Sequence, residues 1–227
     1  MSGPAANRGI AVLASGEGTN LQALIDAAAR DALHGRIELV LSDRADAGAL
    51  VRARAAGIHA VHLPPGDWPD RAAYDRALAA LLAEHGIGLV VLAGFMRILD
   101  AEVVGGFAGR MLNIHPSLLP RHRGLHPHRK ALAAGDRVHG ATVHFVVPEL
   151  DAGPSILQYR IAIQPWDNPA SLARRVRQGE HFIYPLAVRW WLQGRLDCRD
   201  GQARLDGQPL AAPLVVTRDM APVAVCA

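Results

Sequence analysis

Two polar side chains stand two residues apart near the end of an apolar run, within the stretch 112–124. If this run is a strand, Asn113 and His115 point to the same face of a sheet, because side chains alternate between its faces. Pro116 ends the strand, since its ring removes the backbone N–H. An amide and an imidazole held side by side can both donate hydrogen bonds to an oxygen that develops negative charge. The pair therefore predicts a centre for acyl transfer.

A carboxylate to accompany this pair is found at Asp151, in a loop bounded by Pro148 and Pro154. It would hold the imidazole in its charged form and help to move a proton to a leaving nitrogen, directly or through water. An acyl group can then pass to a substrate amine without a nucleophile from the protein. Ser117 is a rival, as a nucleophile with His115 as its base. It lacks a glycine-flanked elbow, however, and its place after a proline favours a loop hydroxyl bonded to backbone.

Four of the eleven histidines lie close together in the sequence here, at His115, His122, His126 and His128. A zinc site would add cysteine or carboxylate ligands at familiar spacings, or a His-Glu-x-x-His pattern, and the sequence has neither. We therefore expect no metal. We interpret most of these histidines as surface residues of a basic, mobile loop.

A glycine-rich segment, Ser-Gly-Glu-Gly-Thr-Asn from residue 15, joins the first predicted strand to the first predicted helix. Free backbone N–H groups and the helix dipole favour an anion at such a junction, and Gly18, Thr19 and Asn20 would hold it. Leu21 occupies the third position of a dinucleotide fingerprint, and no Gly-Lys-Ser/Thr follows, which argues against NAD and ATP. A phosphomonoester is the specific hypothesis. The simpler alternative is a tight turn with Thr19 or Asn20 as helix N-cap.

These side chains need a sheet to position them, and the hydrophobic pattern predicts one. Apolar runs alternate with helical patterns over the first two-thirds of the chain, which is typical of parallel strands with helices on both faces. After Gly140, two consecutive strand-like runs predict antiparallel strands, followed by a long helix and a hairpin. Strands are expected at 9–15, 37–42, 59–63, 88–93, 141–147 and 155–163, and helices at 21–30, 47–56, 69–85 and 169–192. The fold class is therefore α/β, with a doubly wound, mostly parallel central sheet and antiparallel C-terminal strands.

Composition narrows the class of protein further. Half of the 227 residues are hydrophobic, yet no apolar stretch reaches the roughly 20 residues of a membrane span. Residues 1–7 lack the regions of a signal peptide, so we expect a cytoplasmic protein. Lys and Arg number 24 against 21 Asp and Glu, and they are scattered rather than clustered, which favours a small anionic substrate over nucleic acid. The alternative is that this small excess of positive charge serves only solubility. Cys198 and Cys226 have no redox or ligand spacing.

Several segments taken together resemble the phosphoribosylglycinamide formyltransferase family, the folate-dependent transformylases of purine biosynthesis. They are the loop from Ser15, LAGFMRIL at 92–99, NIHPSLLP at 113–120, GLHPHR at 124–129, HGATVHF at 139–145 and ELDAGP at 149–154. The resemblance implies a Rossmann-like formyltransferase fold. It also implies transfer of a formyl group from 10-formyltetrahydrofolate, as co-substrate, to the amino group of glycinamide ribonucleotide.

The same resemblance implies roles for individual residues. Asn113, His115 and Asp151 match the family's catalytic asparagine, histidine and aspartate. Gly18, Thr19 and Asn20 match its phosphate-binding segment, and Glu180 matches an acidic residue that contacts the glycinamide substrate. Folate contacts are implied for Arg71, Met96, Arg97, Ile98, Leu99, Val147, Pro148, Glu149 and Leu150. We expect one domain over 1–210, with a phosphate-binding half (1–110) and a catalytic and folate-binding half (111–210), then a tail over 211–227.

Two other functions are compatible with parts of this pattern. A 10-formyltetrahydrofolate hydrolase would use a similar asparagine, histidine and aspartate with water as acceptor, but it would not need the phosphate-binding loop. A non-catalytic folate- or nucleotide-binding module would not need the catalytic residues. Small-molecule substrates and a monomer or homodimer are expected.

Overall fold

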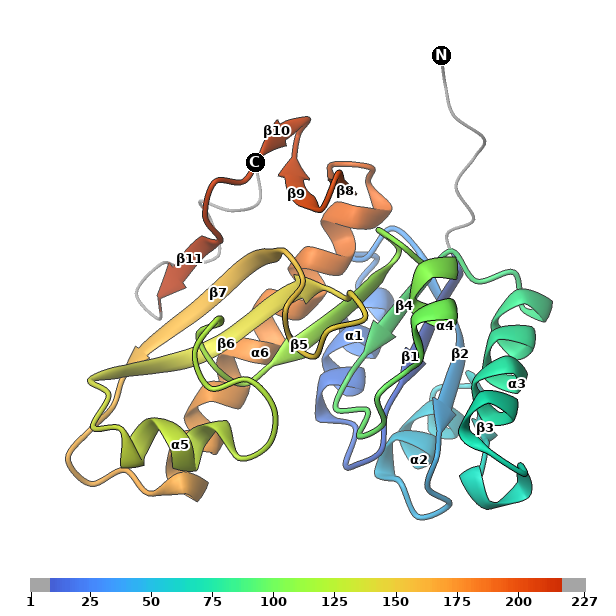
Figure 1. Cartoon of the computed structure of the whole chain (residues 1–227), viewed down its shortest axis with the longest axis horizontal. Helices are drawn as coiled ribbons and strands as arrows, with labels where there is room; N and C mark the ends of the chain where they lie inside the picture. The colour runs from blue at the N-terminus through green and yellow to red at the C-terminus, as the bar shows by residue number, and fades with distance from the viewer. Residues whose placement is uncertain (1–8, 218–227) are drawn as a thin grey trace.

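The computed structural model of the chain describes residues 9–217 and contains an eight-stranded central sheet (Figure 1). Its strand order is β11-β7-β6-β5-β4-β1-β2-β3. β1 to β5 pair in parallel, whereas β6 is antiparallel to both of its neighbours. The strands are β1 Gly9–Leu13, β2 Arg36–Ser42, β3 His59–His62, β4 Leu89–Leu92, β5 Met111–His115, β6 Val138–Phe145, β7 Ser155–Ala162 and β11 Leu214–Thr217. The predicted α/β class with a mostly parallel sheet is confirmed.

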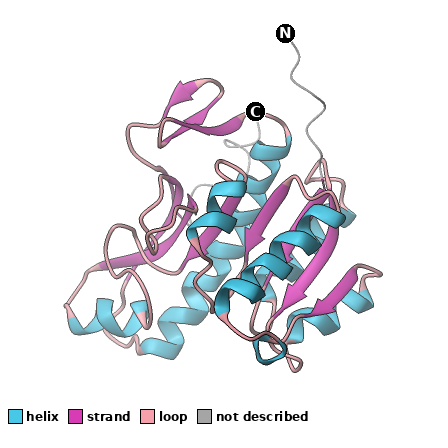
Figure 2. Cartoon of the chain, turned by 45° about the vertical axis from the view of Figure 1, so that its right-hand side comes forward, coloured by secondary structure: helices cyan, strands magenta, loops and turns pink. Residues whose placement is uncertain are grey.

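Helices cover both faces of this sheet (Figure 2). β1 shows why its apolar run is continuous: Ile10 and Val12 belong to the core on one face, and Ala11 and Leu13 to the core on the other. The first core includes residues of α1, α2 and α6, and the second includes residues of α3 and α4. The helices are α1 Thr19–Ala29, α2 Gly48–Ala55, α3 Arg71–Glu84, α4 Ala101–Gly106, α5 Pro127–Ala133 and α6 Pro169–Leu192, with a 3-10 turn at Pro65–Asp67.

The order in which successive strands are added to the sheet reverses at β1, which lies between β2 and β4. Loops that leave the sheet in opposite directions open a crevice at such a point, and ligands of open α/β sheets bind there. The loops that follow β1 and β4 are hydrogen-bonded to each other. The Ser15 backbone N–H donates to the carbonyl of Gly94 at 3.1 Å, and the Met96 N–H donates to the Ser15 hydroxyl at 2.9 Å. The crevice thus has a fixed floor.

The long helix α6 is tied to the middle of the sheet. Asn168 caps its N-terminus by accepting from the backbone N–H groups of Ala170 and Ser171. The hydroxyl of the fully buried Tyr184 lies 2.8 Å from the carbonyl oxygen of Leu92, the last residue of β4, and 3.0 Å from that of Leu112 in β5. These contacts position the residues of α6 that face the crevice.

The later part of the chain differs from expectation in three places. Two short helices, α4 and α5, were not predicted, and α5 begins within the stretch expected to be a mobile loop. The predicted hairpin is a three-stranded sheet of β8 Leu196–Arg199, β9 Gln202–Leu205 and β10 Gln208–Pro209, with positive φ at both of its Asp-Gly turns. Within the expected tail, β11 pairs in parallel with β7, and residues 218–227 lie outside the described residues.

Candidate active site

The structure brings the three predicted catalytic side chains together at the end of β5. Asn113 and His115 project from the same face of this strand, and Asp151 comes from the turn between β6 and β7. Nδ1 of His115 lies 3.2 Å from Oδ2 of Asp151, and Nδ2 of Asn113 lies 3.4 Å from Oδ1. The His115 and Asp151 side chains are only 9% and 7% exposed, so their interaction is little screened by solvent.

Asp151 owes its position to an unusual turn. Its φ of 49° lies in the left-handed region, which aspartate adopts more readily than most residues. A Cβ at Gly153 would lie 1.9 Å from the carbonyl oxygen of Phe145, so only glycine lets the turn pass so close to β6. The carboxylate also accepts from the backbone N–H of Gly124 at 2.9 Å. Backbone geometry therefore directs this charge at His115.

Both ring nitrogens of His115 face oxygen acceptors. Nδ1 faces the Asp151 carboxylate, and Nε2 lies 3.0 Å from the backbone carbonyl oxygen of His122. Neither acceptor has a hydrogen to give, so both contacts are satisfied only when each nitrogen carries a hydrogen, as in imidazolium. With a hydrogen on Nε2, the ring can donate to a developing oxyanion.

His144 is a site residue that the sequence interpretation missed. It lies directly opposite Asn113 in the β5–β6 pair, and its Nδ1–H donates to the carbonyl of Phe145 at 2.8 Å. Burial lowers the pKa of His144 to about 4, so its Nε2 is a neutral acceptor for Nδ2 of Asn113 at 3.0 Å. This contact fixes the direction of the Asn113 amide. Only the register between β5 and β6 reveals it.

The glycine-rich segment forms the N-terminus of α1. Gly18 is its N-cap with φ 73°, and a Cβ there would lie 2.6 Å from Cα of Ala49. The alternative of Thr19 or Asn20 as N-cap is wrong, and among the described residues no side chain caps this helix. Uncapped N–H groups at a helix N-terminus attract anions.

Asn20 turns away from this cap and donates through Nδ2 to Oε2 of Glu180 at 2.8 Å, joining α1 to α6. Glu180 is 8% exposed. Burial raises the pKa of its carboxyl group, although the hydrogen bond from Asn20 and the charge of Arg177 oppose this effect. Arg177, which sequence reasoning did not select, also pairs with Glu17 at 3.3 Å. Arg177 therefore lies beside the glycine-rich segment, where its charge is paired with the Glu17 carboxylate.

Several of the residues predicted to contact folate line one cavity of about 430 Å³, namely Arg71, Ile98, Leu99 and Pro148, together with Ala72, Asp100 and Ala101. Arg71 donates to the carbonyl of Ile98 at 2.6 Å. Arg97 is not part of this wall, because its guanidinium lies over the ring of Tyr74 at 4.5 Å. Met96 and Ile98 are 68% and 55% exposed, whereas Leu99 is buried. Val147 is half-buried, and Glu149 and Leu150 are exposed.

Comparisons with known proteins agree with this geometry. The sequence profile of the formyl transferase family matches residues 8–188. Phosphoribosylglycinamide formyltransferase of Escherichia coli is 49% identical over 201 residues, which are 88% of this chain and 95% of that protein. The chain belongs to the phosphoribosylglycinamide formyltransferase family.

Solved structures extend the comparison. The phosphoribosylglycinamide formyltransferase of Coxiella burnetii has a TM-score of 0.86 and 45% identity, covering 91% of this chain and 98% of that one. A formyltetrahydrofolate deformylase from Pseudomonas syringae has a TM-score of 0.80 and 28% identity, covering 88% and 66%. The formyltransferase fold is therefore shared with an enzyme named for hydrolysis.

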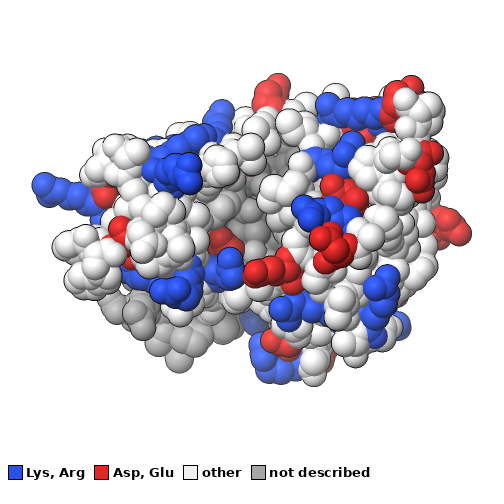
Figure 3. All heavy atoms as spheres, turned by 90° about the horizontal axis from the view of Figure 1, so that it is seen from below, with Lys and Arg blue, Asp and Glu red and all other residues white. Residues whose placement is uncertain are grey.

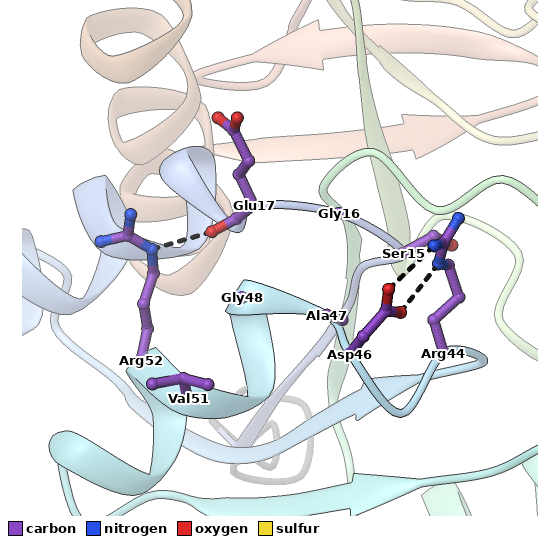
Figure 4. A pocket seen from close by; sticks show the side chains of 9 residues that line it. All are labelled: Ser15, Gly16, Glu17, Arg44, Asp46, Ala47, Gly48, Val51 and Arg52. Atoms are coloured by element: carbon purple, nitrogen blue, oxygen red, sulfur yellow. Dashed lines mark hydrogen bonds and ion pairs between the residues drawn. The ribbon is translucent and has the colours of Figure 1, made fainter.

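A second cavity of about 650 Å³ lies on the α2 side of the glycine-rich segment of this formyltransferase (Figure 4). Two arginines line it, but Arg44 pairs with Asp46, and Arg52 donates to the carbonyl of Glu17 at 2.8 Å. The lining also includes the acidic residues Glu17 and Asp46, so the formal charges of the cavity wall cancel. Basic and acidic side chains are also interspersed over the face seen in Figure 3.

We expected most of the four histidines at 115, 122, 126 and 128 to lie at the surface, and this expectation is wrong. His115 is buried, and His122 and His128 are partly buried, which leaves His126 exposed. Nδ1 of His128 lies 3.0 Å from Nε2 of the buried His139. The described residues contain no cluster of three or more side chains suited to a metal ion, and none of their helices is long and apolar enough to cross a membrane.

The His128–His139 pair predicts a loss of stability in acid. Burial lowers both pKa values from 6.5 to about 4. The unfolded chain therefore takes up protons that the folded chain refuses between these pH values, and the free energy of unfolding falls as the pH falls through this window. Calorimetry should show a Tm that decreases from pH 6.5 to 4, with a shallower slope for His128→Gln. An equal slope in both proteins would contradict this origin.

Proposed function

We propose that this chain transfers a formyl group from 10-formyltetrahydrofolate to the amino group of glycinamide ribonucleotide, in purine biosynthesis. The observation that carries the proposal is the convergence of Asn113 and His115 on the Asp151 carboxylate, at 3.4 and 3.2 Å, at the end of β5. The chain that contains these three residues is 49% identical to the Escherichia coli phosphoribosylglycinamide formyltransferase.

The chemistry follows from the donors and the carboxylate. The amine nitrogen of glycinamide ribonucleotide attacks the formyl carbon, and the π electrons of the carbonyl move to its oxygen. Nδ2 of Asn113 and Nε2 of His115 donate to this oxyanion. When the bond between the carbon and N10 breaks, N10 keeps the electron pair and gains the proton that the attacking nitrogen loses. Asp151 assists this proton transfer, directly or through water.

Asn113 and His115 must each release a present contact before they can donate to the oxyanion. The Asn113 amide keeps its 3.0 Å bond to His144 and releases the 3.4 Å contact with Asp151, which is the longer and weaker one. Nε2 of His115 exchanges the carbonyl of His122 for the formyl oxygen.

The phosphate of glycinamide ribonucleotide is assigned to Gly18, Thr19 and Asn20, where the uncapped N-terminus of α1 favours an anion. Glu180 is assigned to the glycinamide portion, with Asn20 holding its carboxylate. The folate is assigned to the cavity beside Arg71, Ile98 and Pro148 and to the loop 147–150. Exposed apolar side chains at Met96 and Leu150 suit a ring system better than solvent.

An assay of folate release tests the proposal against hydrolysis. Purified protein is mixed with 10-formyltetrahydrofolate, and release of the deformylated folate is followed with and without glycinamide ribonucleotide. We expect release that depends on the ribonucleotide and equals the amount of formylated product. Release at the same rate without it would assign the chain to hydrolysis, and no release in either case would support a non-catalytic binding module.

Replacing Asn20 by alanine is expected to weaken binding of the ribonucleotide more than it slows the reaction. The change leaves the buried Glu180 carboxylate without its 2.8 Å donor. Hydrogen bonds to charged groups contribute enough that the KM for glycinamide ribonucleotide should rise about tenfold or more, with a smaller change in kcat. Initial rates over a range of both substrates measure this. If only the KM for the folate changed, the phosphate would be misplaced in our assignment.

Three further expectations from the sequence stay predictions. They are the division of the formyltransferase domain into halves 1–110 and 111–210, a monomeric or homodimeric state, and a cytoplasmic location. Sedimentation of the full chain would show whether it is a monomer or a homodimer.

A further inference from the structure

A segment that we call the strap, residues 117–124, returns from the end of β5 to contact His115. Its first half is fixed to the interior of the sheet by uncharged hydrogen bonds. The Thr142 hydroxyl donates to the carbonyl of Ser117 at 2.7 Å, and the Gln158 amide donates to that of Leu119 at 2.9 Å. Thr142 and Gln158 are both buried, so this half of the strap has little freedom.

The second half depends on one side chain. His122 has a φ of 56°, in the left-handed region that L side chains enter only at a cost in free energy. Its Nε2 lies 2.7 Å from Oδ2 of Asp136, whose side chain is 5% exposed. Arg121, which is 58% exposed, reaches the other oxygen of Asp136 from solvent. The contact of Asp136 with His122 is thus less exposed to solvent than its contact with Arg121. It is made by the residue whose backbone adopts the unfavourable left-handed conformation.

The strap's backbone contacts both His115 and Asp151. The carbonyl oxygen of His122 lies 3.0 Å from Nε2 of His115. Two residues later, the N–H of Gly124 donates to Oδ2 of Asp151 at 2.9 Å. A rotation of the peptide at His122 would therefore remove an acceptor from His115 and disturb the donor to Asp151.

We propose that His122 is a positioning residue, whose pairing with Asp136 holds its own carbonyl oxygen on the Nε2 hydrogen of His115 until the formyl oxygen takes that place. Both oxygens are carbonyl acceptors, so one hydrogen serves each in turn. The charge on Asp136 supports this arrangement. Burial pushes the pKa of Asp136 upward, but the hydrogen bond from His122 and the charges of Arg121 and His122 outweigh burial and keep it below the ordinary value. The inference rests on the proposed function for its formyl acceptor.

Steady-state kinetics on the full chain test the positioning role. His122→Ala is expected to lower kcat about tenfold, because removing a residue that positions a functional side chain commonly has an effect of this size. The KM of both substrates should change less than about twofold. His122→Asn should recover most of this loss, because asparagine tolerates the left-handed region and retains a donor. The matched control is Arg121→Ala, which removes the other partner of Asp136 and should keep kcat within about twofold. An unchanged kcat in His122→Ala would overturn the proposal.

A second measurement needs no substrate. Nitrogen-15 NMR of the histidine rings, with His115 assigned by its loss in His115→Ala, should show hydrogens on both ring nitrogens of His115 in the unsubstituted protein. In His122→Ala the Nε2 hydrogen should exchange with water fast enough to broaden its signal. His122→Gly keeps the left-handed backbone but loses the pair, and it should behave in the same way even if the alanine variant does not fold. Unchanged His115 signals in the folded variants would refute the role, whereas an inactive unsubstituted protein would refute only the proposed function.

Discussion

Replacing Asp151 by asparagine is expected to lower kcat for formyl transfer by about a hundredfold or more, which corresponds to about 2.7 kcal/mol of activation free energy. Asparagine has the same shape and also tolerates the left-handed φ of 49° at this position, so the turn should survive. What disappears is the negative charge 3.2 Å from Nδ1 of His115. The buried His115 ring then lacks its charged partner, and the proton from the attacking amine lacks its acceptor. Single-turnover rates with both substrates saturating would measure the loss.

The control for this variant is Asp167→Asn. The Asp167 side chain is fully buried. Hydrogen bonds from the Gln164 backbone N–H and the Ser171 hydroxyl, together with the charge of Arg175, hold the pKa of its carboxyl group below the ordinary value against the effect of burial. It lies just before α6, outside the catalytic contacts, so its loss should lower the free energy of unfolding and leave kcat nearly unchanged. Near-normal turnover in Asp151→Asn, or equal losses in the two variants, would remove Asp151 from the proposed mechanism.

The parts of the fold that follow from local pattern were predictable. The β1 run alternates between two cores, and no polar residue interrupts it, which is the pattern of a strand buried on both faces. Asn113 and His115 share a face because strand geometry leaves no alternative once β5 is recognised. The Asp-Gly hairpins could be predicted because few residue pairs accept positive φ at both positions. In each case the determining interaction spans only a few residues.

The parts that depend on distant partners could be found only from the structure. His144 faces Asn113 through strand register, and no local pattern states that register. α5 is short, and its N-cap His126 has a φ of 58° with no side-chain cap, so none of the usual start signals except Pro127 marks it. His122 and His128 were expected at the surface, because their respective partners Asp136 and His139 come later in the chain. β11 needs the free edge of β7 to form a strand at all.

Replacing Asn113 by alanine is the companion test of the oxyanion donors, and again a loss of about a hundredfold or more in kcat is expected. The amide has two hydrogens, one of which is held by His144 at 3.0 Å while the other makes only the 3.4 Å contact with Asp151. The second hydrogen is thus the one available to the formyl oxygen. Because the interaction strengthens as charge develops, the KM of both substrates should change far less than kcat.

Asn113→Asp separates donation from packing. Aspartate fills the same space, but its ionised form cannot donate and it would place a second negative charge beside Asp151, so kcat should fall at least as far as in the alanine variant. Asn168→Ala supplies the control for a lost asparagine: it removes the N-cap of α6 and should cost about 1 kcal/mol of stability without lowering kcat. If Asn113→Asp kept most of the activity, Asn113 would be a packing residue, and His115 alone would have to carry the oxyanion.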